Sequence, residues 1–483
     1  MTGLEEWIGA ETGFATASML GAVSATHLVM DRPGFGQRII PRPGSVLASP
    51  VPAHYDPDPD YFFHWFRDSA IVIDALRVAL AAGYADRAAF VRFGEFVQFS
   101  RSLQTLDGRE ALRRSDFKAG VQPSFLQYVR PDAEIAALSG EAVLADVRVN
   151  ADGTLDFIRW SRPQHDGPAL RCLALLRWWR DFPPAEATLR AALGEVVSGD
   201  LAFSLSHAHL RSSDIWEEES GYHYYTQLVQ SQALSCGAPW LEEAGQPARA
   251  QACRLAADQI VTRLDGFWNG AGGFYRSRTA HESGDPNREL DIAVMLAVLH
   301  GGRASGSHSV LDPKAQATLT ALEELFETAY AINRERPPGR GVAMGRYAND
   351  RYYSGGAWFF ATLAAAEFYF RLAAALGGGA PLPVTEENLR FRQRLGVAAA
   401  GADSGRLAVL ALERGDAVMR TVQAFTPAGG DLSEQFDQTT GAQTSARHLA
   451  WSYAAFITAA AARGEACRSI AATDPATAPA GTA

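Results

Sequence analysis

Five segments of the chain combine tryptophan or tyrosine with arginine and carboxylates, the side chains that can bind and cleave sugars. They are DYFFHWFRDSA (60–70), RWSRPQHDGPALR (159–171), RSSDIWEEESGYHYY (211–225), GVAMGRYANDRYYSGGAWFF (341–360) and DLSEQFDQTTGAQTSARHLAWSYAAF (431–456). Aromatic rings stack on the apolar faces of a sugar, and Asp/Arg pairs read its hydroxyls through charge-assisted hydrogen bonds. Cleavage of a glycosidic bond needs two carboxyl groups, one as acid and one as base or nucleophile. The segments therefore predict a sugar-binding pocket with candidates for both roles.

Each of these features, taken alone, also has a purely structural explanation. Five tryptophans would equally suit core positions at helix ends: Trp65, Trp160, Trp216, Trp358 and Trp451. Asp68 precedes an apolar run as a helix N-cap does, and Arg67 with Asp68 would suit a structural ion pair. The acidic run at 217–219 would suit a solvated helix start favoured by the helix dipole, and Glu434 a loop acid. The recurrence of five such segments favours the functional interpretation.

Most of the remaining chain has apolar residues at the spacing of amphipathic helices. The pattern predicts twelve helices, at about 4–25, 68–83, 85–104, 166–181, 184–207, 222–236, 247–265, 288–301, 313–332, 355–376, 404–424 and 444–463. Alternating strands are scarce, although 143–149 and 155–160 would form a small hairpin around Asp152-Gly153. No stretch reads as a domain linker, so we expect an all-α fold in one domain.

Twelve helices in one domain suggest a closed toroid of helical hairpins, with an inner ring and an outer ring. A helical solenoid is the alternative, but the sequence contains no repeated motif. The five aromatic segments precede the second, fourth, sixth, tenth and twelfth predicted helices. In an alternating toroid these helices share one ring, so their N-terminal ends would bring all five segments to one face around one pocket.

The composition of the chain excludes several classes of ligand. The 483 residues carry a formal net charge of −10, which argues against a nucleic-acid partner and fits a neutral substrate. The four cysteines, Cys172, Cys236, Cys253 and Cys467, form no CxxC pair, so we expect buried free thiols and no structural zinc. No His/Cys cluster suggests another metal, and two-carboxylate chemistry needs no cofactor.

The termini and apolar runs bear on location. No run approaches about 18 apolar residues, so we expect no membrane helix. Glu5 and Glu6 stand where a secretory signal needs Lys or Arg, which predicts a cytoplasmic protein if the chain is full-length, and a periplasmic or secreted one if a signal was removed. The Pro/Ala-rich stretch 468–483 is expected to be a disordered tail after a single domain at 1–467, and the protein is expected to be a monomer.

From about residue 4 to 463, the five segments resemble those of the glucoamylases, glycoside hydrolase family 15. The resemblance implies an (α/α)6 barrel with the active-site pocket at one end, and no metal or cofactor. It implies exo-acting removal of β-D-glucose from the non-reducing ends of α-1,4-glucans and maltooligosaccharides, with inversion. It places the general acid at Glu217 and the general base at Glu434.

The same resemblance implies a set of substrate-binding residues. They are Tyr61 and Trp65 around the first glucose, Arg67 and Asp68 gripping it, Trp160 and Trp216 beside the general acid, Glu218 next to it, Arg346, the further pocket positions Asp350, Tyr352 and Trp358, and the pocket-wall residue Trp451.

The sequence departs from the family pattern at Arg159, Glu219, Tyr222, His223 and His448. Because Glu219, Tyr222 and His223 are expected near the outer subsites, a preference for α-1,6 bonds (isomaltose, dextran) or trehalose stays open beside α-1,4. No starch-binding domain is expected, which favours soluble maltodextrins over granular starch. Two alternatives of other classes are a non-catalytic sugar-binding regulatory module, which should have lost a carboxylate or the pocket grip, and a zinc-dependent prenyltransferase, which needs a metal-ligand constellation.

Overall fold

The computed structural model describes residues 3–55, 57–114, 116–281, 284–397 and 403–473. Twelve long helices run through these residues: α1 (Leu4–Gly21), α2 (Phe66–Ala81), α3 (Ala88–Leu103), α7 (Asp166–Asp181), α8 (Ala187–His207), α9 (Tyr224–Glu243), α10 (Pro247–Asp265), α11 (Ala293–Gly301), α12 (Pro313–Ala329), α14 (Phe359–Gly377), α16 (Ser404–Phe425) and α17 (Ala450–Thr473). Each corresponds to one of the predicted helices, so the predicted all-α class is confirmed.

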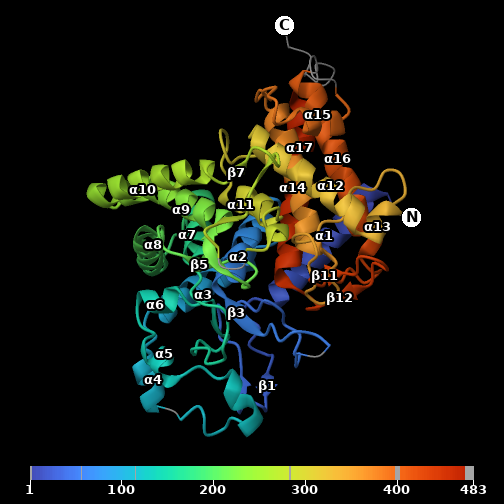
Figure 1. Cartoon of the computed structure of the whole chain (residues 1–483). Coiled ribbons are helices and arrows are strands. Elements are labelled where there is room, and N and C mark those ends of the chain that lie inside the picture. Colours follow the sequence, from blue (N-terminus) through green and yellow to red (C-terminus); the bar gives the residue numbers. More distant parts are fainter. Residues whose placement is uncertain (1–2, 56, 115, 282–283, 398–402, 474–483) are drawn as a thin grey trace.

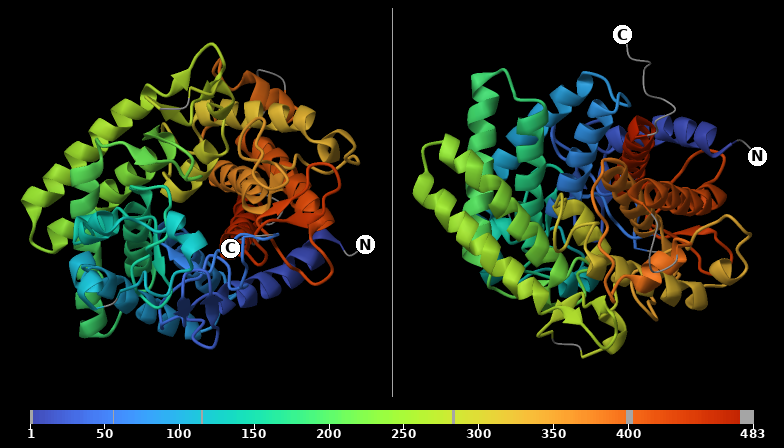
Figure 2. Two further views of the ribbon diagram at one scale, coloured as in Figure 1. Left: turned by 60° about the horizontal axis from the view of Figure 1, so that its bottom comes forward. Right: turned by 90° about the horizontal axis from the view of Figure 1, so that it is seen from above.

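The long helices form two concentric rings (Figures 1 and 2). In the inner ring, α2, α7, α9, α11, α14 and α17 each pack against the next, and α17 packs against α2 to close the circle. Outside them, α1 packs on α17, α3 on α2, α8 on α7, α10 on α9, α12 on α11 and α16 on α14. This closed arrangement is the predicted (α/α)6 barrel, and closure excludes the solenoid.

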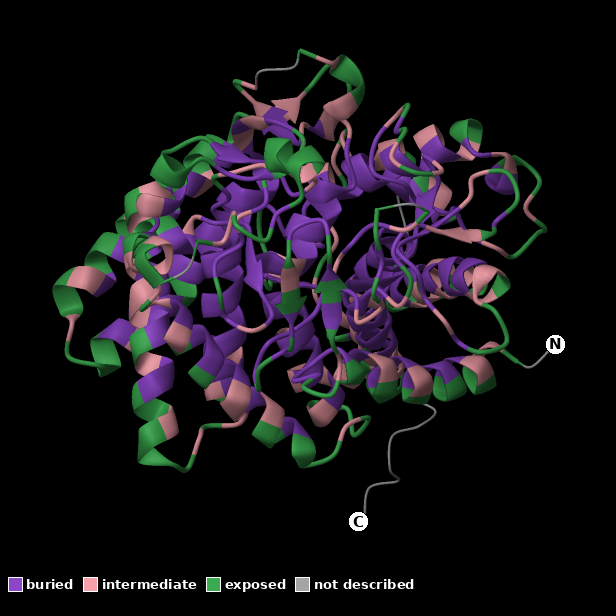
Figure 3. Cartoon of the chain, turned by 90° about the horizontal axis from the view of Figure 1, so that it is seen from below, coloured by how far each residue is buried: buried purple, intermediate pink, exposed green. Residues whose placement is uncertain are grey.

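Burial separates the two rings. The outer helix α10 is buried only at Ala250, Cys253, Ala257, Ile260 and Leu264, the single stripe of an amphipathic helix. The inner helix α14 is buried along nearly its whole length. Figure 3 shows the same contrast for the whole molecule, with buried residues inside and exposed residues on the outer helices. Helix α14 is also long and apolar enough to cross a membrane, but 83% of that stretch is buried inside the molecule. The expectation that no segment reaches membrane length therefore fails for α14, whose burial is that of a core helix.

Short strands fix the loops at the N-terminal ends of the inner helices. Strand β3 (Phe63–Trp65) pairs with β4 (Arg148–Asn150) before α2, and β6 (Ser220–His223) lies between β5 (Ser212–Ser213) and β9 (Arg278–Thr279) before α9. Before α14, β10 (Ala357–Trp358), β11 (Gln435–Phe436) and β12 (Gln443–Thr444) form a third sheet. All three sheets are antiparallel.

The remaining elements lie in the connections. They are β1 (Met30–Arg32), β2 (Gln37–Ile39), α4 (Gly108–Arg114), η1 (Pro123–Tyr128), α5 (Asp132–Ala136), α6 (Glu141–Leu144), β7 (Trp268–Asn269), β8 (Phe274–Tyr275), η2 (Pro286–Arg288), α13 (Ala331–Arg334) and α15 (Leu389–Arg394). The predicted hairpin of 143–149 with 155–160 is wrong, because its start is helical in α6 and β4 pairs with β3. Only an isolated bridge, Val149 to Leu155, joins the two segments.

Two further sequence expectations need correction. Helix α17 runs to Thr473 and so includes the start of the predicted tail, while residues 474–483 lie outside the described part. Cys172 and Cys253 are buried free thiols as expected, whereas the free Cys236 is exposed and the free Cys467 is only partly buried.

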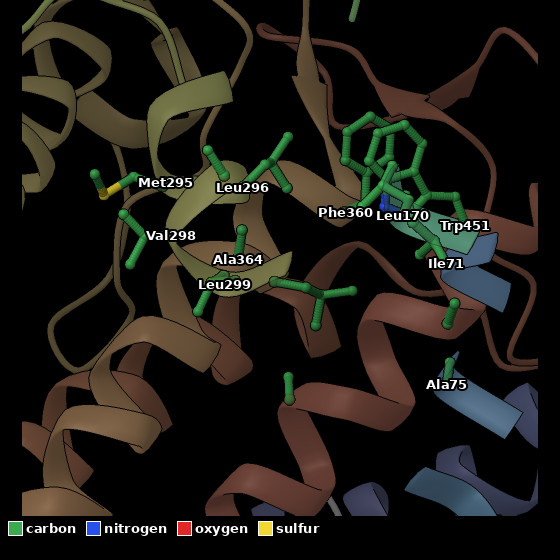
Figure 4. Close-up of a cluster of buried hydrophobic side chains, with 14 of the residues drawn as sticks. Ile71, Ala75, Leu170, Met295, Leu296, Val298, Leu299, Phe360, Ala364 and Trp451 are labelled. Atoms are coloured by element: carbon green, nitrogen blue, oxygen red, sulfur yellow. The ribbon is translucent and has the colours of Figure 1, made fainter. Parts of the chain in front are cut away.

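The axis of the inner ring is filled by apolar side chains from several helices. Ile71, Leu170, Leu296, Phe360 and Trp451, from α2, α7, α11, α14 and α17, belong to one buried cluster (Figure 4). The rings of Phe360 and Trp451 stack at 4.2 Å between centroids, with 7° between their planes. The ring is therefore a packed core rather than an open channel.

Candidate active site

The five aromatic segments meet on one face of the ring, at the N-terminal ends of α2, α7, α9, α14 and α17. They enclose a pocket of about 220 Å³. Thirteen of the fourteen predicted site residues line it: Tyr61, Trp65, Arg67, Asp68, Trp160, Trp216, Glu217, Glu218, Arg346, Tyr352, Trp358, Glu434 and Trp451. The exception is Asp350, which lies behind Arg346 and accepts hydrogen bonds from its Nε and Nη2 at 2.7 and 2.6 Å.

The pocket is closed at its inner end. Phe360 and Trp451 line it and also line a smaller cavity of about 40 Å³, whose walls come from α2, α7, α11, α14 and α17. The stacked pair therefore forms a floor between the two spaces. A pocket with such a floor admits the end of a chain molecule but not its middle.

Glu217 occupies a strained turn between β5 and β6, with φ at +64°. The Glu217 N–H donates to the Asp214 carbonyl at 3.0 Å. The Asp214 carboxylate in turn accepts the N–H groups of Glu218 and Glu219 at 2.7 and 3.1 Å. A non-glycine residue stays at positive φ only where its surroundings fix it, and such strain gathers at functional sites. The interpretation of 217–219 as a helix start is wrong, because α9 begins at Tyr224.

Three donors orient the Glu217 carboxylate. Oε1 accepts from the indole Nε1 of Trp65 at 2.8 Å and from Nη2 of Arg67 at 3.0 Å. Oε2 accepts from the indole Nε1 of Trp160. Trp216 makes no such bond, because its indole donates to Asp291 at 2.8 Å. The three donors therefore come from two segments distant from Glu217 in sequence, the β3–α2 junction and the loop before α7.

Buried charge surrounds Arg67. Its Nη2 lies 3.3 Å from Asp68 and its Nη1 lies 3.6 Å from Asp166. Burial raises the pKa of Asp68 to about 6 and that of Asp166 to about 6, and Arg67 opposes both shifts. Asp166, the first residue of α7, was not among the predicted site residues, although its acidic side chain directly before an apolar run was visible in the sequence.

Glu434 lies in the strand-flanking loop between α16 and α17 and is 4% exposed. Its backbone accepts from the Phe359 N–H at 3.1 Å and donates to the Ala446 carbonyl at 2.8 Å, which fixes it to the start of α14. The Ser445 hydroxyl donates to Glu434 Oε2. Burial raises the pKa of Glu434 to about 7, while the Ser445 hydrogen bond and the nearby Arg346 lower it. Glu434 therefore changes charge near neutral pH.

Glu218 is held on the other wall of the pocket. Its Oε1 lies 3.0 Å from Arg346 Nη2, and its Oε2 accepts from the Tyr347 hydroxyl at 2.6 Å. Arg288 Nη2 lies 2.5 Å from the same Oε2. Sequence reasoning missed Arg288, Tyr347 and Asp291, as well as Asp214 and Ser445. Arg288 and Asp291 precede α11, the one inner helix that none of the five aromatic segments precedes. This helix therefore also carries polar residues at its N-terminal end.

The departures from the family pattern do not line the pocket. Glu219 is buried against Arg278, and His223 is buried with its Nε2 hydrogen-bonded to the Ser212 carbonyl. Tyr222, Arg159 and His448 bond His209, Val129 and Tyr453 respectively. The pocket lining itself therefore keeps the pattern that the sequence suggested.

Known proteins are similar to this chain over most of its length. Residues 144–461 match the family model "Glycosyl hydrolases family 15". Glucoamylase-1 of Schizophyllum commune is 28% identical over 442 residues, covering 87% of this chain and 69% of that protein. The probable glucoamylase of Schizosaccharomyces pombe is 27% identical over 475 residues, covering 94% of this chain and 91% of that protein.

A solved structure has the same fold. The family 15 glucoamylase from Hypocrea jecorina superposes with a TM-score of 0.77 at 28% identity, covering 96% of this chain and 72% of that one. Because the family model matches well over half of the sequence, the chain belongs to glycosyl hydrolase family 15, as a glycoside hydrolase of the glucoamylase (glucan 1,4-α-glucosidase) type.

Proposed function

We propose that this enzyme is an inverting exo-α-glucosidase that releases β-D-glucose from the non-reducing ends of maltooligosaccharides, with Glu217 as general acid and Glu434 as general base. The observation that carries the proposal is the meeting of these two carboxylates in one closed-ended pocket. The floor formed by Phe360 and Trp451 supports exo action, since only a chain end fits such a pocket.

Glu217, in its protonated form, gives its proton to the glycosidic oxygen as the bond to the anomeric carbon breaks. General acid catalysis of this kind contributes roughly 10²–10⁴-fold. The strained turn and the Trp65, Trp160 and Arg67 donors hold the carboxyl group in one orientation. The carboxyl group is therefore oriented for proton transfer before the substrate binds.

Glu434, in its ionised form, takes a proton from a water molecule as that water bonds to the anomeric carbon from the opposite face. Ser445 donates to Oε2 of the carboxylate and so orients it. Because a water must fit between base and sugar, inverting enzymes hold their carboxyl groups roughly 6.5–9.5 Å apart. The proton lost by water goes to Glu434, and the proton gained by the leaving sugar comes from Glu217.

Several polar groups in the pocket suit sugar hydroxyls. Within the described residues, the indole N–H groups of Trp358 and Trp451 are buried without a hydrogen-bond partner, and Asp68 Oδ2 has only its ion pair with Arg67. Buried polar groups left unpaired are rare and call for a ligand or water. Together with Arg67, they would read the hydroxyls of the terminal glucose, while Glu218 and Arg346 would lie toward the leaving group.

The proposal is tested with Glu217→Gln and Glu434→Gln, each assayed for glucose released from maltose, isomaltose and trehalose. Each variant should lose at least about 10²-fold of the activity while keeping a cooperative melting transition and the far-UV circular dichroism spectrum of the wild type. Near wild-type activity in either variant would contradict the catalytic role proposed for the residue that was replaced. The ranking of the three disaccharides for the wild type decides between α-1,4, α-1,6 and trehalose preference.

A further inference from the structure

Arg288 lies outside the pocket lining, yet its side chain reaches the turn that carries Glu217. It ends the short helix η2 and precedes α11, and its side chain is 11% exposed. None of the five aromatic segments precedes α11, so Arg288 reaches the pocket region from a loop outside those segments.

One guanidinium nitrogen of Arg288 serves two carboxylates. Nη2 lies 2.9 Å from Asp214 Oδ2 and 2.5 Å from Glu218 Oε2. The guanidinium also lies 4.8 Å from the centre of the Tyr347 ring, whose hydroxyl donates to the same Glu218 oxygen. Arg288 is thus the shared partner of the residue that shapes the turn and of the acid that follows Glu217.

The Asp214 contact bears on the shape of the turn. Oδ1 of Asp214 accepts the backbone N–H groups of Glu218 and Glu219, while Oδ2 faces Arg288. Burial raises the pKa of Asp214 to about 6, and Arg288 is the main group that opposes this rise. A charged carboxylate accepts these backbone hydrogen bonds more strongly than a neutral one.

The Glu218 contact bears on the pocket wall. Without Arg288, Glu218 would keep the Arg346 contact on Oε1 and the Tyr347 hydrogen bond on Oε2. It would lose the only one of its two arginine contacts that is made through Oε2. Glu218 is 29% exposed, so its side chain would then have room to turn toward solvent. Buried ion-pair clusters add little net stability, so stability alone does not account for this arrangement.

We propose that Arg288 is a positioning residue that fixes the Glu218 carboxylate on the leaving-group side of the pocket and, through Asp214, the turn that carries Glu217. This inference rests on the proposed function. Arg288 touches no substrate itself, and its effect on catalysis passes through Glu218 and the turn.

A double-mutant cycle tests the inference: Arg288→Met, Glu218→Gln and the combined variant, assayed by kcat/KM on maltose. Arg288→Met should lower kcat/KM about tenfold in the wild-type background, the size of one lost charge-assisted hydrogen bond. In the Glu218→Gln background the same change should cost less than about threefold, because the route through Glu218 is already lost and only the route through Asp214 remains. Arg288→Lys should recover most of the loss.

Arg276→Met is the matched control. Arg276 pairs with Glu289 at 3.1 Å on the same connection, but contacts neither Asp214 nor Glu218 in the described structure. Its kcat/KM should stay within about twofold of the wild type, because the pair is partly exposed and lies outside the groups through which Arg288 is proposed to act. Melting temperatures of all variants separate lost stability from lost positioning.

Three results overturn the inference. They are a tenfold loss that is equal in both backgrounds, no larger loss for Arg288→Met than for Arg276→Met, and no recovery with Arg288→Lys. If Arg288→Met does not fold, Arg288→Gln carries the same cycle, and failure of both to fold makes Arg288 a structural residue. A wild-type enzyme that releases no glucose from any disaccharide overturns the proposed function and this inference together, whereas an active enzyme with additive effects overturns only the inference.

Discussion

Ser445→Ala should move the acidic limb of the pH–activity profile toward higher pH. Glu434 must be ionised to act as a base, and burial raises its pKa to about 7 against the lowering effect of the Ser445 hydrogen bond and Arg346. Removing the hydroxyl removes a donor that favours the ionised carboxylate. The pKa of Glu434 should therefore rise, and the fraction of active enzyme at a given acidic pH should fall.

The magnitude follows from the strength of that hydrogen bond. A hydrogen bond to a charged group is worth about 1.5 kcal/mol, and 1.36 kcal/mol corresponds to one pKa unit. The acidic limb of kcat/KM should thus move up by about one unit, which lowers kcat/KM at pH 6 about tenfold. On the alkaline side of the limb, where Glu434 is ionised in both proteins, the two rates should converge.

The assay is kcat/KM for maltose between pH 4 and pH 9, because this parameter reports the ionisations of the free enzyme. Ser204→Ala is the matched control, since the Ser204 hydroxyl is buried but donates to the Asp200 carbonyl on α8. Its profile should coincide with that of the wild type. An acidic limb that stays in place in Ser445→Ala, or moves to lower pH, would refute the assignment of that limb to Glu434.

Three further predictions concern stability and orientation. Because the pKa of Glu434 is raised, the folded protein binds more protons than the unfolded chain between about pH 4.5 and pH 7, so this group's contribution to stability is lost as pH rises through that window. The difference in unfolding free energy between Glu434→Gln and the wild type, measured in urea, should therefore be about 3 kcal/mol more favourable to the variant at pH 8 than at pH 4. The same difference at both pH values would contradict the burial argument. Trp65→Phe, which removes the 2.8 Å indole hydrogen bond to Glu217, should lower kcat on maltose about tenfold with a smaller change in KM, and an unchanged kcat would show that this donor is dispensable. Arg171→Met should cost about 3–5 kcal/mol of unfolding free energy, since it leaves Asp200 buried and unpaired between α7 and α8, and a loss below about 1 kcal/mol would show that the structure relaxes around it.

The ring of helices could be predicted from the sequence because apolar spacing depends on local periodicity. Helices α7 and α10 have the predicted bounds, 166–181 and 247–265, and the count of twelve placed five polar segments on one face. The family resemblance then selected side chains that the fold does bring into one pocket. The helix count and the placement of the segments needed only local periodicity and the order of elements, whereas the choice of side chains needed the resemblance.

The missed residues depend on tertiary contacts. Arg288 and Asp291 fell inside the predicted helix 288–301, but α11 begins only at Ala293. The acidic run at 217–219 looked like a helix start, whereas pairing of β5 with β6 and capping by Asp214 make it a turn. Likewise, the shifted pKa of Glu434 arises from burial by segments distant in sequence. Local propensity contains none of this information.

The assignment of Glu217 and Glu434 as acid and base of a single inverting displacement is tested most directly by the anomeric form of the first glucose released. Proton NMR of wild-type enzyme with maltose, recorded before mutarotation, should show β-D-glucose as the first product. Release of α-D-glucose would mean retention at the anomeric carbon and a covalent intermediate, which contradicts the roles proposed for both carboxylates.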